Sequence, residues 1–359
     1  MLTTSKVKTA QELMKDNMLV KHFAGSIAYG TNLPTSDTDY RGIFCADPIN
    51  VRTPFFPIRE AEDTTEEDTK LFELAHFMKL CLDCNPNVVE TLWVDSSDIT
   101  YTTPAYQLLR DHRDQLLSTK IAYSTCGYAM AQLKRIKGHN KWINQPQPKD
   151  KPEQWAFVSL VQWFGKDKVL PRDFNLTLYN KGYMLVSFGN NMYGLYDNEK
   201  RSAVRPDGSL NTNFDGDRES LEPPKAVIKF NKEEWKLACD KWDQYWKWKA
   251  NRNAARSELE EEHGYDTKHA MHLVRLLRMG VESLRDGVIL VKRPDAEELL
   301  DIRNGALTYE ELITYSESLE ANIQQLRETT SLPKAPNIKL GADLLMEVQN
   351  IMWRIPSTT

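Results

Sequence analysis

The stretch GSIAYGTNLPTSDTDY, residues 25–40, places a Gly-Ser pair a short loop ahead of two aspartates, Asp37 and Asp39. A glycine lets the main chain approach a ligand closely, and the N–H groups that follow Gly25, together with the Ser26 hydroxyl, can bind an anion. Asp37 and Asp39 are one residue apart, so on a strand both side chains would project from the same face. The stretch therefore predicts a phosphate at one end and a metal at the other.

Two carboxylates on one face repel each other unless cations share them, and Mg²⁺ prefers carboxylates combined with phosphate oxygens and water. In two-metal phosphoryl transfer, ions ~4 Å apart activate the attacking oxygen and neutralise the leaving pyrophosphate. A third acid from a neighbouring strand is needed; Asp68, just ahead of TKLFEL, is the first candidate and Glu73 the second. We expect two Mg²⁺ ions, for which Mn²⁺ could substitute, on Asp37, Asp39 and Asp68.

The elements that must position these groups can be read from hydrophobic spacing. The pattern predicts a short helix over residues 6–18, strands at 19–25, 37–47 and 69–74, and a helix over 75–84. Further along, it predicts helix from about 101 to 138, hairpins between 174 and 224, a long Trp-rich helix over 232–262 and an amphipathic helix over 267–287. This order indicates an α+β protein in which a small N-terminal unit is followed by a mainly helical body with a β-hairpin insertion.

Composition narrows the class of protein. Of the 359 residues, 41% are hydrophobic and 27% charged, and no apolar run approaches the ~20 residues of a membrane helix. The first twenty residues carry charges throughout and do not resemble a signal peptide, so we expect a cytoplasmic protein. The odd number of cysteines, five, fits a reducing compartment. The net charge of −5 provides no global basic field, so a polyanion would need a local cationic patch.

The combination GSIAYGT and SDTDYRG resembles the Gly-Ser plus Asp-x-Asp signature of the polymerase-β-like nucleotidyltransferase superfamily. The wider pattern is similar to a phage and bacterial branch associated with RNA repair, through NPNVVETLW, NRNAARSELEEEHGYDTKHAMHLVRLL and RPDAEELLDIRNG. The resemblance covers the first ~100 residues and patches of the last third. It implies a small palm over residues 1–100, a mixed sheet with flanking helices. A helical domain over 101–359, with a β-rich insertion at about 170–225, would complete the nucleotide and acceptor site.

The resemblance also implies roles for individual residues. Gly25 and Ser26 would hold the triphosphate of an NTP, ATP among the candidates, and Asp37 and Asp39 would bind the metals. The branch's C-terminal pattern contains the same KHAMHLVRLL run. The predicted nucleotide-binding set is Gly25, Ser26, Tyr29, Ser36, Arg41, Lys268, His272 and Arg275.

Several of these residues have a structural interpretation beside the functional one. Arg41 could contact a phosphate or pair with Asp37 or another acid. Lys268, His272 and Arg275 share a helix face, which could bind phosphates or be a solvated surface. Aromatic and cationic residues also share one face of the predicted Trp-rich helix. They could stack a base, but an aromatic face of this kind more often packs in a core. The members of this face are Trp242, Trp246, Lys249, Asn253 and Arg256.

Other candidates favour structure over chemistry. Cys81 and Cys84 have redox or zinc spacing, but no second pair completes a zinc site, so buried thiols are favoured. His22, inside the first strand, is favoured as a packed histidine.

The leading hypothesis is a metal-dependent nucleotidyltransferase that moves a nucleoside monophosphate from an NTP to an acceptor hydroxyl and releases pyrophosphate. By resemblance, the favoured acceptor is an RNA 3′ end, and the protein would be bacterial or phage-encoded. Transfer to a protein or a small molecule stays open. A non-catalytic binding or antitoxin-like module and a nuclease that uses the same carboxylates are the alternatives from other classes.

Overall fold

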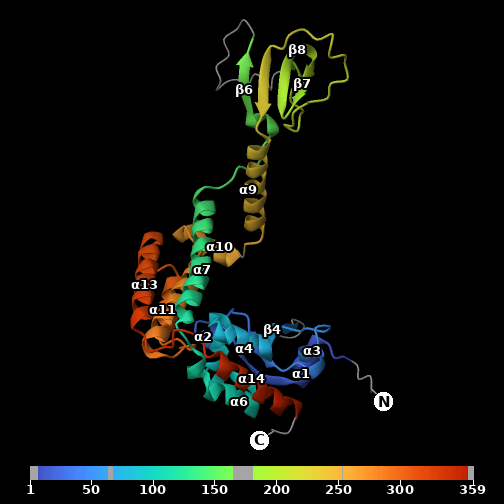
Figure 1. Cartoon of the computed structure of the whole chain (residues 1–359). Helices are drawn as coiled ribbons and strands as arrows, with labels where there is room; N and C mark the ends of the chain where they lie inside the picture. The colour runs from blue at the N-terminus through green and yellow to red at the C-terminus, as the bar shows by residue number, and fades with distance from the viewer. Residues whose placement is uncertain (1–6, 64–67, 165–180, 253, 355–359) are drawn as a thin grey trace, which may run out of the picture. The chain divides into compact units, whose positions relative to one another are not determined.

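The computed structural model describes residues 7–63, 68–164, 181–252 and 254–354 (Figure 1). Contacts group the chain into two compact units, the first made of Met1–Ile143 with Ser257–Thr359 and the second of Asn144–Arg256. The second unit is thus inserted into the sequence of the first. These compact units have other boundaries than the predicted division into 1–100 and 101–359. That division concerns the extent of the catalytic domain, and it stays a prediction.

The first unit contains a five-stranded mixed sheet with the order β3-β4-β2-β1-β5. Its strands are β1 (Met18–Phe23), β2 (Asp39–Phe44), β3 (Glu60–Asp63), β4 (Asp68–Glu73) and β5 (Ile99–Thr102). β2 and β4 are parallel, and the other neighbours are antiparallel. The three predicted strands correspond to β1, β2 and β4, whereas β3 lies in a segment for which the pattern predicts no strand.

Helices surround this sheet. They are α1 (Ala10–Asp16), α2 (Gly25–Tyr29), α3 (Pro48–Arg52), α4 (Leu74–Leu82), α5 (Pro86–Val89), α6 (Pro104–Asp111), α7 (Lys120–Asn144), α10 (Ala254–His263), α11 (Thr267–Asp286), α12 (Ala296–Arg303), α13 (Tyr309–Thr329) and α14 (Ile338–Trp353). Short 3₁₀ turns are η1 (Glu90–Leu92), η2 (Ser96–Asp98) and η3 (Arg113–Leu116). Local signals set several ends: a Thr9 capping box starts α1, proline opens α5 and α6, and Gly287 in the left-handed conformation ends α11.

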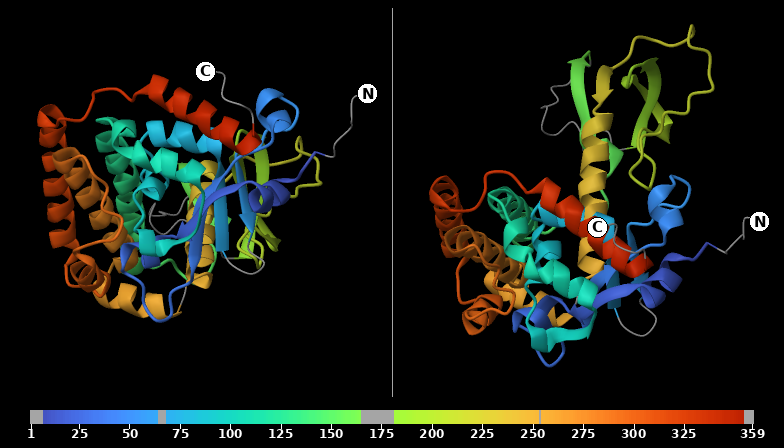
Figure 2. Two further views of the ribbon diagram at one scale, coloured as in Figure 1. Left: turned by 90° about the horizontal axis from the view of Figure 1, so that it is seen from below. Right: turned by 60° about the horizontal axis from the view of Figure 1, so that its bottom comes forward.

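One large hydrophobic core joins the sheet to the C-terminal helices. It includes Leu19 and Ile43 from the strands, Val89 from α5, Leu277 from α11 and Leu344 from α14. α11 packs against α12 and α13, while α14 lies against α4 and α6, as the two views of Figure 2 show. The C-terminal helices therefore belong to the same folded body as the motif near the N-terminus.

The second unit contains a four-stranded antiparallel sheet with the order β6-β9-β8-β7. Its elements are β6 (Val158–Trp163), β7 (Lys181–Gly189), β8 (Met192–Ser202), β9 (Ala226–Phe230), α9 (Lys232–Ala250) and the 3₁₀ turn η4 (Gln154–Phe157). The β7–β8 hairpin confirms the predicted β-hairpin insertion; residues 170–180 of that prediction lie outside the described residues.

The single long helix predicted over 232–262 is wrong, because α9 ends at Ala250 and α10 begins at Ala254. The side-chain amide of Asn251 donates to the Lys247 carbonyl, so one of the last carbonyls of α9 has its partner there.

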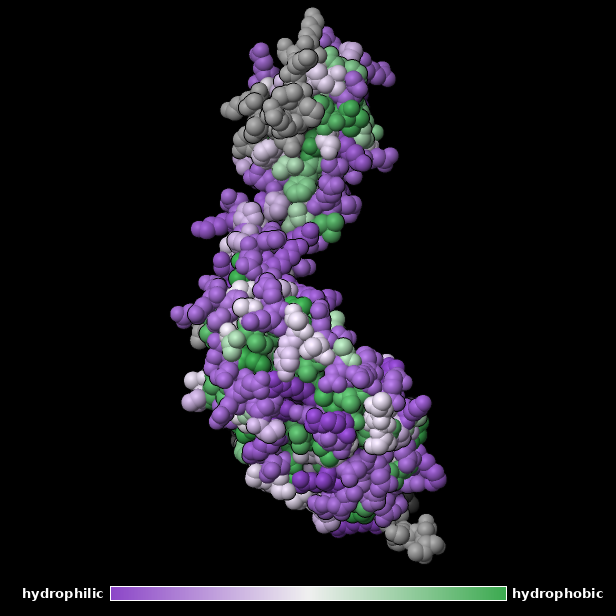
Figure 3. All heavy atoms as spheres, turned by 90° about the vertical axis from the view of Figure 1, so that its left-hand side faces the viewer, coloured by the Kyte–Doolittle hydropathy of each residue, from purple (hydrophilic) through white to green (hydrophobic). Residues whose placement is uncertain are grey.

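Hydrophilic residues cover much of the face seen in Figure 3, with apolar residues scattered among them. Within the described part of the chain, no helix is both long and apolar enough to span a membrane.

Gly42 gives a test of the sheet, because a Cβ at this position would overlap the carbonyl oxygen of Val20 on the neighbouring strand and lie 3.3 Å from Leu71 Cγ. We expect Gly42→Ala to lower the free energy of unfolding by about 2–3 kcal/mol, measured by chemical denaturation. The matched control is Gly127→Ala in α7, where a Cβ meets no atom within 4 Å. That change should raise stability by about 0.5–1 kcal/mol. Equal effects of the two substitutions would contradict the observed strand register.

Candidate active site

Gly25 packs its backbone directly against an acid. Its φ of +57° lies in the left-handed region, and a Cβ there would sit 2.7 Å from Asp39 Oδ2. Next to it, the Ala24 N–H donates to the Asp39 carbonyl at 2.8 Å. Only glycine combines this conformation with such a close approach. The predicted need for glycine at this position is therefore explained first by Asp39.

Two aspartates begin neighbouring parallel strands. Asp39 is the first residue of β2, Asp68 is the first of β4, and the register places them directly opposite each other. Asp37 lies two residues before β2 and is exposed, so the expectation that it stands on the strand is wrong. The strand pairing starts only at Asp39, where Gly25 and Ala24 meet it.

The electrostatics tie the same residues together. Burial, and then the neighbouring Asp68, raises the pKa of the Asp39 carboxyl. Asp37 adds to this rise, while Arg41 and Lys268 oppose it. The charges of all five residues therefore act at one place, although Lys268 is more than two hundred positions away in the sequence.

The two candidates for the third acid lie at opposite ends of β4. Asp68 is beside Asp39, whereas Glu73 is opposite Phe44 at the far end of the strand. Glu73 caps α4: its Oε2 accepts the Ala75 N–H at 2.7 Å and the His76 N–H at 3.2 Å. Burial raises the pKa of this carboxyl. Of the two, only Asp68 is placed to share an ion with Asp39, and its role as a ligand stays a prediction.

The set of Asp37, Asp39 and Asp68 offers only carboxylate oxygens, which suits a hard cation such as Mg²⁺. Among the described residues, however, the potential ligands that converge within 4.8 Å are those of His139, Glu260 and Asp266.

This second group was not predicted from the sequence. Asp266 Oδ2 accepts from His139 Nδ1 at 3.1 Å and from His269 Nδ1 at 2.6 Å, and Oδ1 accepts the His269 N–H. Burial disfavours the charged carboxylate, but these hydrogen bonds prevail and hold the pKa of Asp266 below its usual range. The group fastens the start of α11 to α7.

The predicted cationic face of α11 is not a uniform solvated surface. Arg275 is only 4% exposed; its guanidinium lies 3.8 Å from the centre of the Tyr29 ring and 3.8 Å from Glu90 Oε2. The Tyr29 hydroxyl donates to Glu90 Oε1 at 2.8 Å. Burial raises the pKa values of both Tyr29 and Glu90. These contacts fasten α11 to the end of α2, and they make Tyr29 and Arg275 supports of the Gly-Ser segment.

The remaining predicted nucleotide-binding residues differ in their surroundings. Burial, followed by the charges of Arg275 and Lys268, lowers the pKa of His272 to about 3, so this side chain is neutral at pH 7. The Ser36 hydroxyl accepts the Leu33 N–H at 2.9 Å and closes the turn before Asp37. Ser26 is half-buried at the start of α2.

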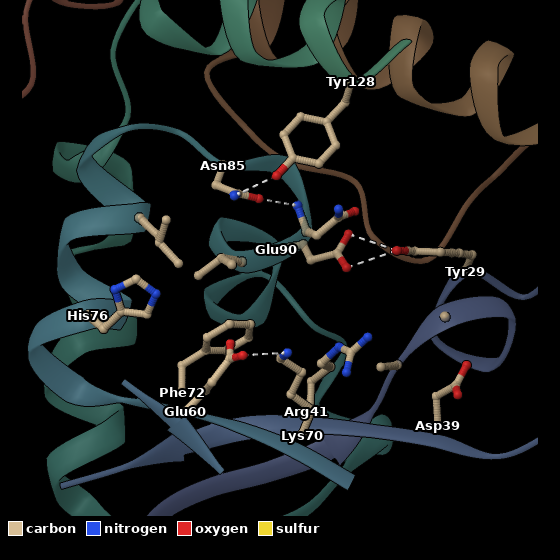
Figure 4. Close-up of a pocket in the computed structure, with 15 residues that line it drawn as sticks. Tyr29, Asp39, Arg41, Glu60, Lys70, Phe72, His76, Asn85, Glu90 and Tyr128 are labelled. Carbon is tan, nitrogen blue, oxygen red and sulfur yellow. Dashed lines mark hydrogen bonds and ion pairs between the residues drawn. The ribbon is translucent and has the colours of Figure 1, made fainter. Parts of the chain in front are cut away.

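A pocket of about 420 Å³ opens beside Asp39. Its lining comes from the strands, α2, α4, the α5–η1 turn and α7, and consists of Ala24, Gly25, Tyr29, Asp39, Arg41, Glu60, Lys70, Phe72, His76, Leu80, Asn85, Asn87, Val88, Glu90 and Tyr128 (Figure 4). Most of these residues were absent from the predicted site. The signal that pointed to some of them was NPNVVETLW, which contains Asn85, Asn87 and Glu90 but was used only for the resemblance.

The candidates favoured as structural are structural. His22 is buried, Nδ1 lies 2.7 Å from the Phe23 carbonyl oxygen, and burial lowers its pKa to about 4. Cys81 and Cys84 are free, buried thiols.

The indoles of Trp242 and Trp246, in the second unit, both donate to the Pro148 carbonyl, at 2.9 and 3.1 Å, and thus cover the Pro-rich segment. The Asn253 and Arg256 side chains, predicted for the same face, lie outside the described part of the chain.

Comparisons with known proteins match part of this chain. Residues 4–149 match the model of the family described as RNA repair pathway DNA polymerase beta family (RlaP). The chain is also 27% identical over 162 residues to the uncharacterized 38.9 kDa protein of the nrdC–mobD intergenic region of Enterobacteria phage T4, a match that covers 38% of this chain and 46%, about half, of the phage protein. No solved structure matches the chain. The predicted resemblance to the polymerase-β-like superfamily, on its phage and bacterial side, is thereby confirmed through residues 4–149, and this family implies a polymerase-β-like nucleotidyltransferase.

Proposed function

We propose that the protein is a metal-dependent nucleotidyltransferase that moves a nucleoside monophosphate from an NTP to the 3′ hydroxyl of an RNA and releases pyrophosphate. The observation that carries the proposal is the side-by-side start of β2 and β4, which pairs Asp39 with Asp68 while Gly25 presses against Asp39. The family description, with its RNA repair pathway, supports an RNA acceptor. The phage relative supports action in a bacterial cytoplasm.

In the proposed reaction, the outer phosphates of the NTP bind the backbone N–H groups that follow Gly25, with Ser26 and Lys268 as further donors. Arg41, two residues after Asp39 on the same face of β2, faces the α-phosphate. The acceptor hydroxyl gives its proton to solvent as its oxygen bonds to the α-phosphorus. The bond between that phosphorus and the bridging oxygen breaks, and pyrophosphate leaves with its electron pair.

Asp37, Asp39 and Asp68 would hold Mg²⁺, which supplies activation of the acceptor and neutralisation of the charge on pyrophosphate. Most of the acceleration then comes from positioning and electrostatics, for which rigid strands are well suited.

The two alternatives from other classes make different predictions. A non-catalytic binding module has no need for acids aligned on neighbouring strands, and it would release no pyrophosphate. A nuclease would use water as the nucleophile, and it would shorten RNA without consuming an NTP. Transfer to a protein or a small molecule would release pyrophosphate without labelled RNA. All of these outcomes can be distinguished in one assay.

The assay incubates the protein with Mg²⁺, each α-³²P-labelled NTP and a pool of small RNAs, and follows labelled RNA and pyrophosphate together. We expect Asp39→Asn and Asp68→Asn to reduce transfer about 100-fold or more, because each removes a carboxylate charge that would hold Mg²⁺ beside the reacting phosphate. The matched control is Glu73→Gln, which keeps an oxygen for the α4 cap and should retain transfer. Full activity of Asp68→Asn together with loss in Glu73→Gln would contradict the assignment of the third acid; thermal melting of each variant checks the fold.

A second prediction separates two cations of α11. We expect Lys268→Ala to weaken NTP binding about tenfold, because Lys268 is half-buried and its charge acts on Asp39. Arg275→Ala should instead lower the free energy of unfolding by about 3–5 kcal/mol, since it leaves Glu90 buried without its cation. Denaturation midpoints and KM values measure the two effects. The double change Glu90→Gln with Arg275→Met should recover much of the stability, and no recovery would contradict the role of this pair.

A further inference from the structure

Two strands, β2 and β4, form the floor of the pocket beside Asp39, and the type of side chain on this floor changes along them. Residues two apart on a strand face the same side, so Asp39 and Arg41 project together from β2, as do Lys70 and Phe72 from β4. The register pairs Arg41 with Lys70. Moving away from the acids, the floor is first cationic and then aromatic (Figure 4).

The two cations of this floor are not equivalent. Lys70 forms ion pairs with Glu60 at 3.0 Å and with Glu62 at 2.7 Å, so its charge is offset within the protein. The Arg41 guanidinium makes no hydrogen bond or ion pair with the residues that the structure describes. It points up from the floor between Asp39 and Glu90, as Figure 4 shows. Its planar set of donors suits a phosphate that lies next to Asp39.

The walls beyond Arg41 combine rings with amides. Phe72 and His76 have ring centres 6.4 Å apart, tilted by 42°, and burial lowers the pKa of His76, which favours the neutral ring. On the opposite wall, Asn85 Nδ2 donates to the Tyr128 hydroxyl at 2.8 Å, which leaves the Tyr128 O–H free to donate into the pocket. Asn87 is exposed at the same turn and adds a second carboxamide.

We propose that this pocket is a nucleoside subsite, in which a flat base lies between the Phe72–His76 wall and the Asn85–Tyr128 wall and its phosphate meets Arg41. A base offers faces for the rings and an edge of donors and acceptors for the amides. The volume of about 420 Å³ is in the range of small-ligand pockets.

The same chemistry is present in two substrates of the proposed reaction, the NTP and the terminal nucleotide of the RNA acceptor. This inference rests on the proposed function for the identity of these ligands, and it assigns base selection to residues outside the Gly-Ser and Asp-x-Asp motif. Carboxamides present one donor group and one acceptor, so they distinguish bases by the pattern on the edge.

The test uses variants that leave the fold intact. Asn87→Ala removes an exposed carboxamide, and Tyr128→Phe removes a hydroxyl while keeping the ring that packs against the core. Asn85 is left unchanged, because its Oδ1 caps α5 by accepting the Asn87 N–H at 3.1 Å. The matched control is Asn322→Ala, at an exposed position of α13.

Two measurements are made on the full chain: equilibrium binding of ATP, GTP, CTP and UTP one at a time without RNA, and the KM for short RNAs that differ only in the 3′-terminal nucleotide. We expect Asn87→Ala and Tyr128→Phe to weaken one of these two ligand classes about tenfold and to change its order of base preference, with Asn322→Ala unchanged. A change in NTP binding assigns the pocket to the incoming base, and a change in the KM for RNA assigns it to the acceptor.

If neither ligand class responds to the variants in affinity or base preference, the nucleoside subsite is overturned, whether or not transfer occurs. If base-selective NTP binding depends on Asn87 and Tyr128 while no transfer to RNA, protein or small molecule is detected, the subsite stands and the proposed function fails. Binding and turnover are thus scored separately.

Discussion

The site depends on holding negative charges next to one another. Asp39 and Asp68 start neighbouring parallel strands, and Gly25 removes the only side chain that would keep the backbone away from Asp39. Burial and then the like charge of Asp68 raise the pKa of the Asp39 carboxyl. A fold keeps such an arrangement only where backbone pairing fixes it and where cations are supplied. The parallel hydrogen bonds of β2 and β4 give the first condition, and Arg41 and Lys268 contribute to the second.

The cations come from parts of the chain that are far apart in sequence. Lys268 belongs to α11, which follows the inserted second unit, and Arg275 on the same helix binds Glu90 and Tyr29 inside the core. Since Tyr29 ends the short helix that starts at Gly25, any displacement of α11 would also move the Gly-Ser segment. The sequence of the second unit can therefore change without changing the site only if the two chain segments that link it to the first unit keep α11 in place.

Much of the site could be predicted because its signals are local. The left-handed backbone at position 25 requires glycine, Asp37 and Asp39 lie in one short stretch, and Asp68 begins a strand with clear β-favouring residues. The same local signals gave the α+β fold and the hairpin insertion. What sequence patterns could not supply was the pairing between strands, which excludes Glu73 from the group around Asp39 by placing it at the far end of β4.

The features that spacing and composition could not show have a common physical cause. Spacing along α11 put Lys268 and Arg275 on one face, but it contains no information on Glu90, whose buried carboxylate draws Arg275 into the core. In the same way, acidic residues 60–63 look like a loop by composition, yet β3 forms because β4 offers a free edge and Lys70 pairs with two of its acids.

In the proposed reaction a negatively charged protein would bind polyanions, which requires it to use its cations selectively. The chain carries a net charge of −5, so a nucleotide or an RNA end gains little from the overall field and must be attracted at short range. Lys70 and Arg275 are offset by acids of the protein itself, whereas Arg41, beside Asp39, has its donors directed into the pocket. Affinity then depends on contacts to the base as well as to phosphate. This is the condition under which the rings and amides beyond Arg41 can decide which nucleotide is bound.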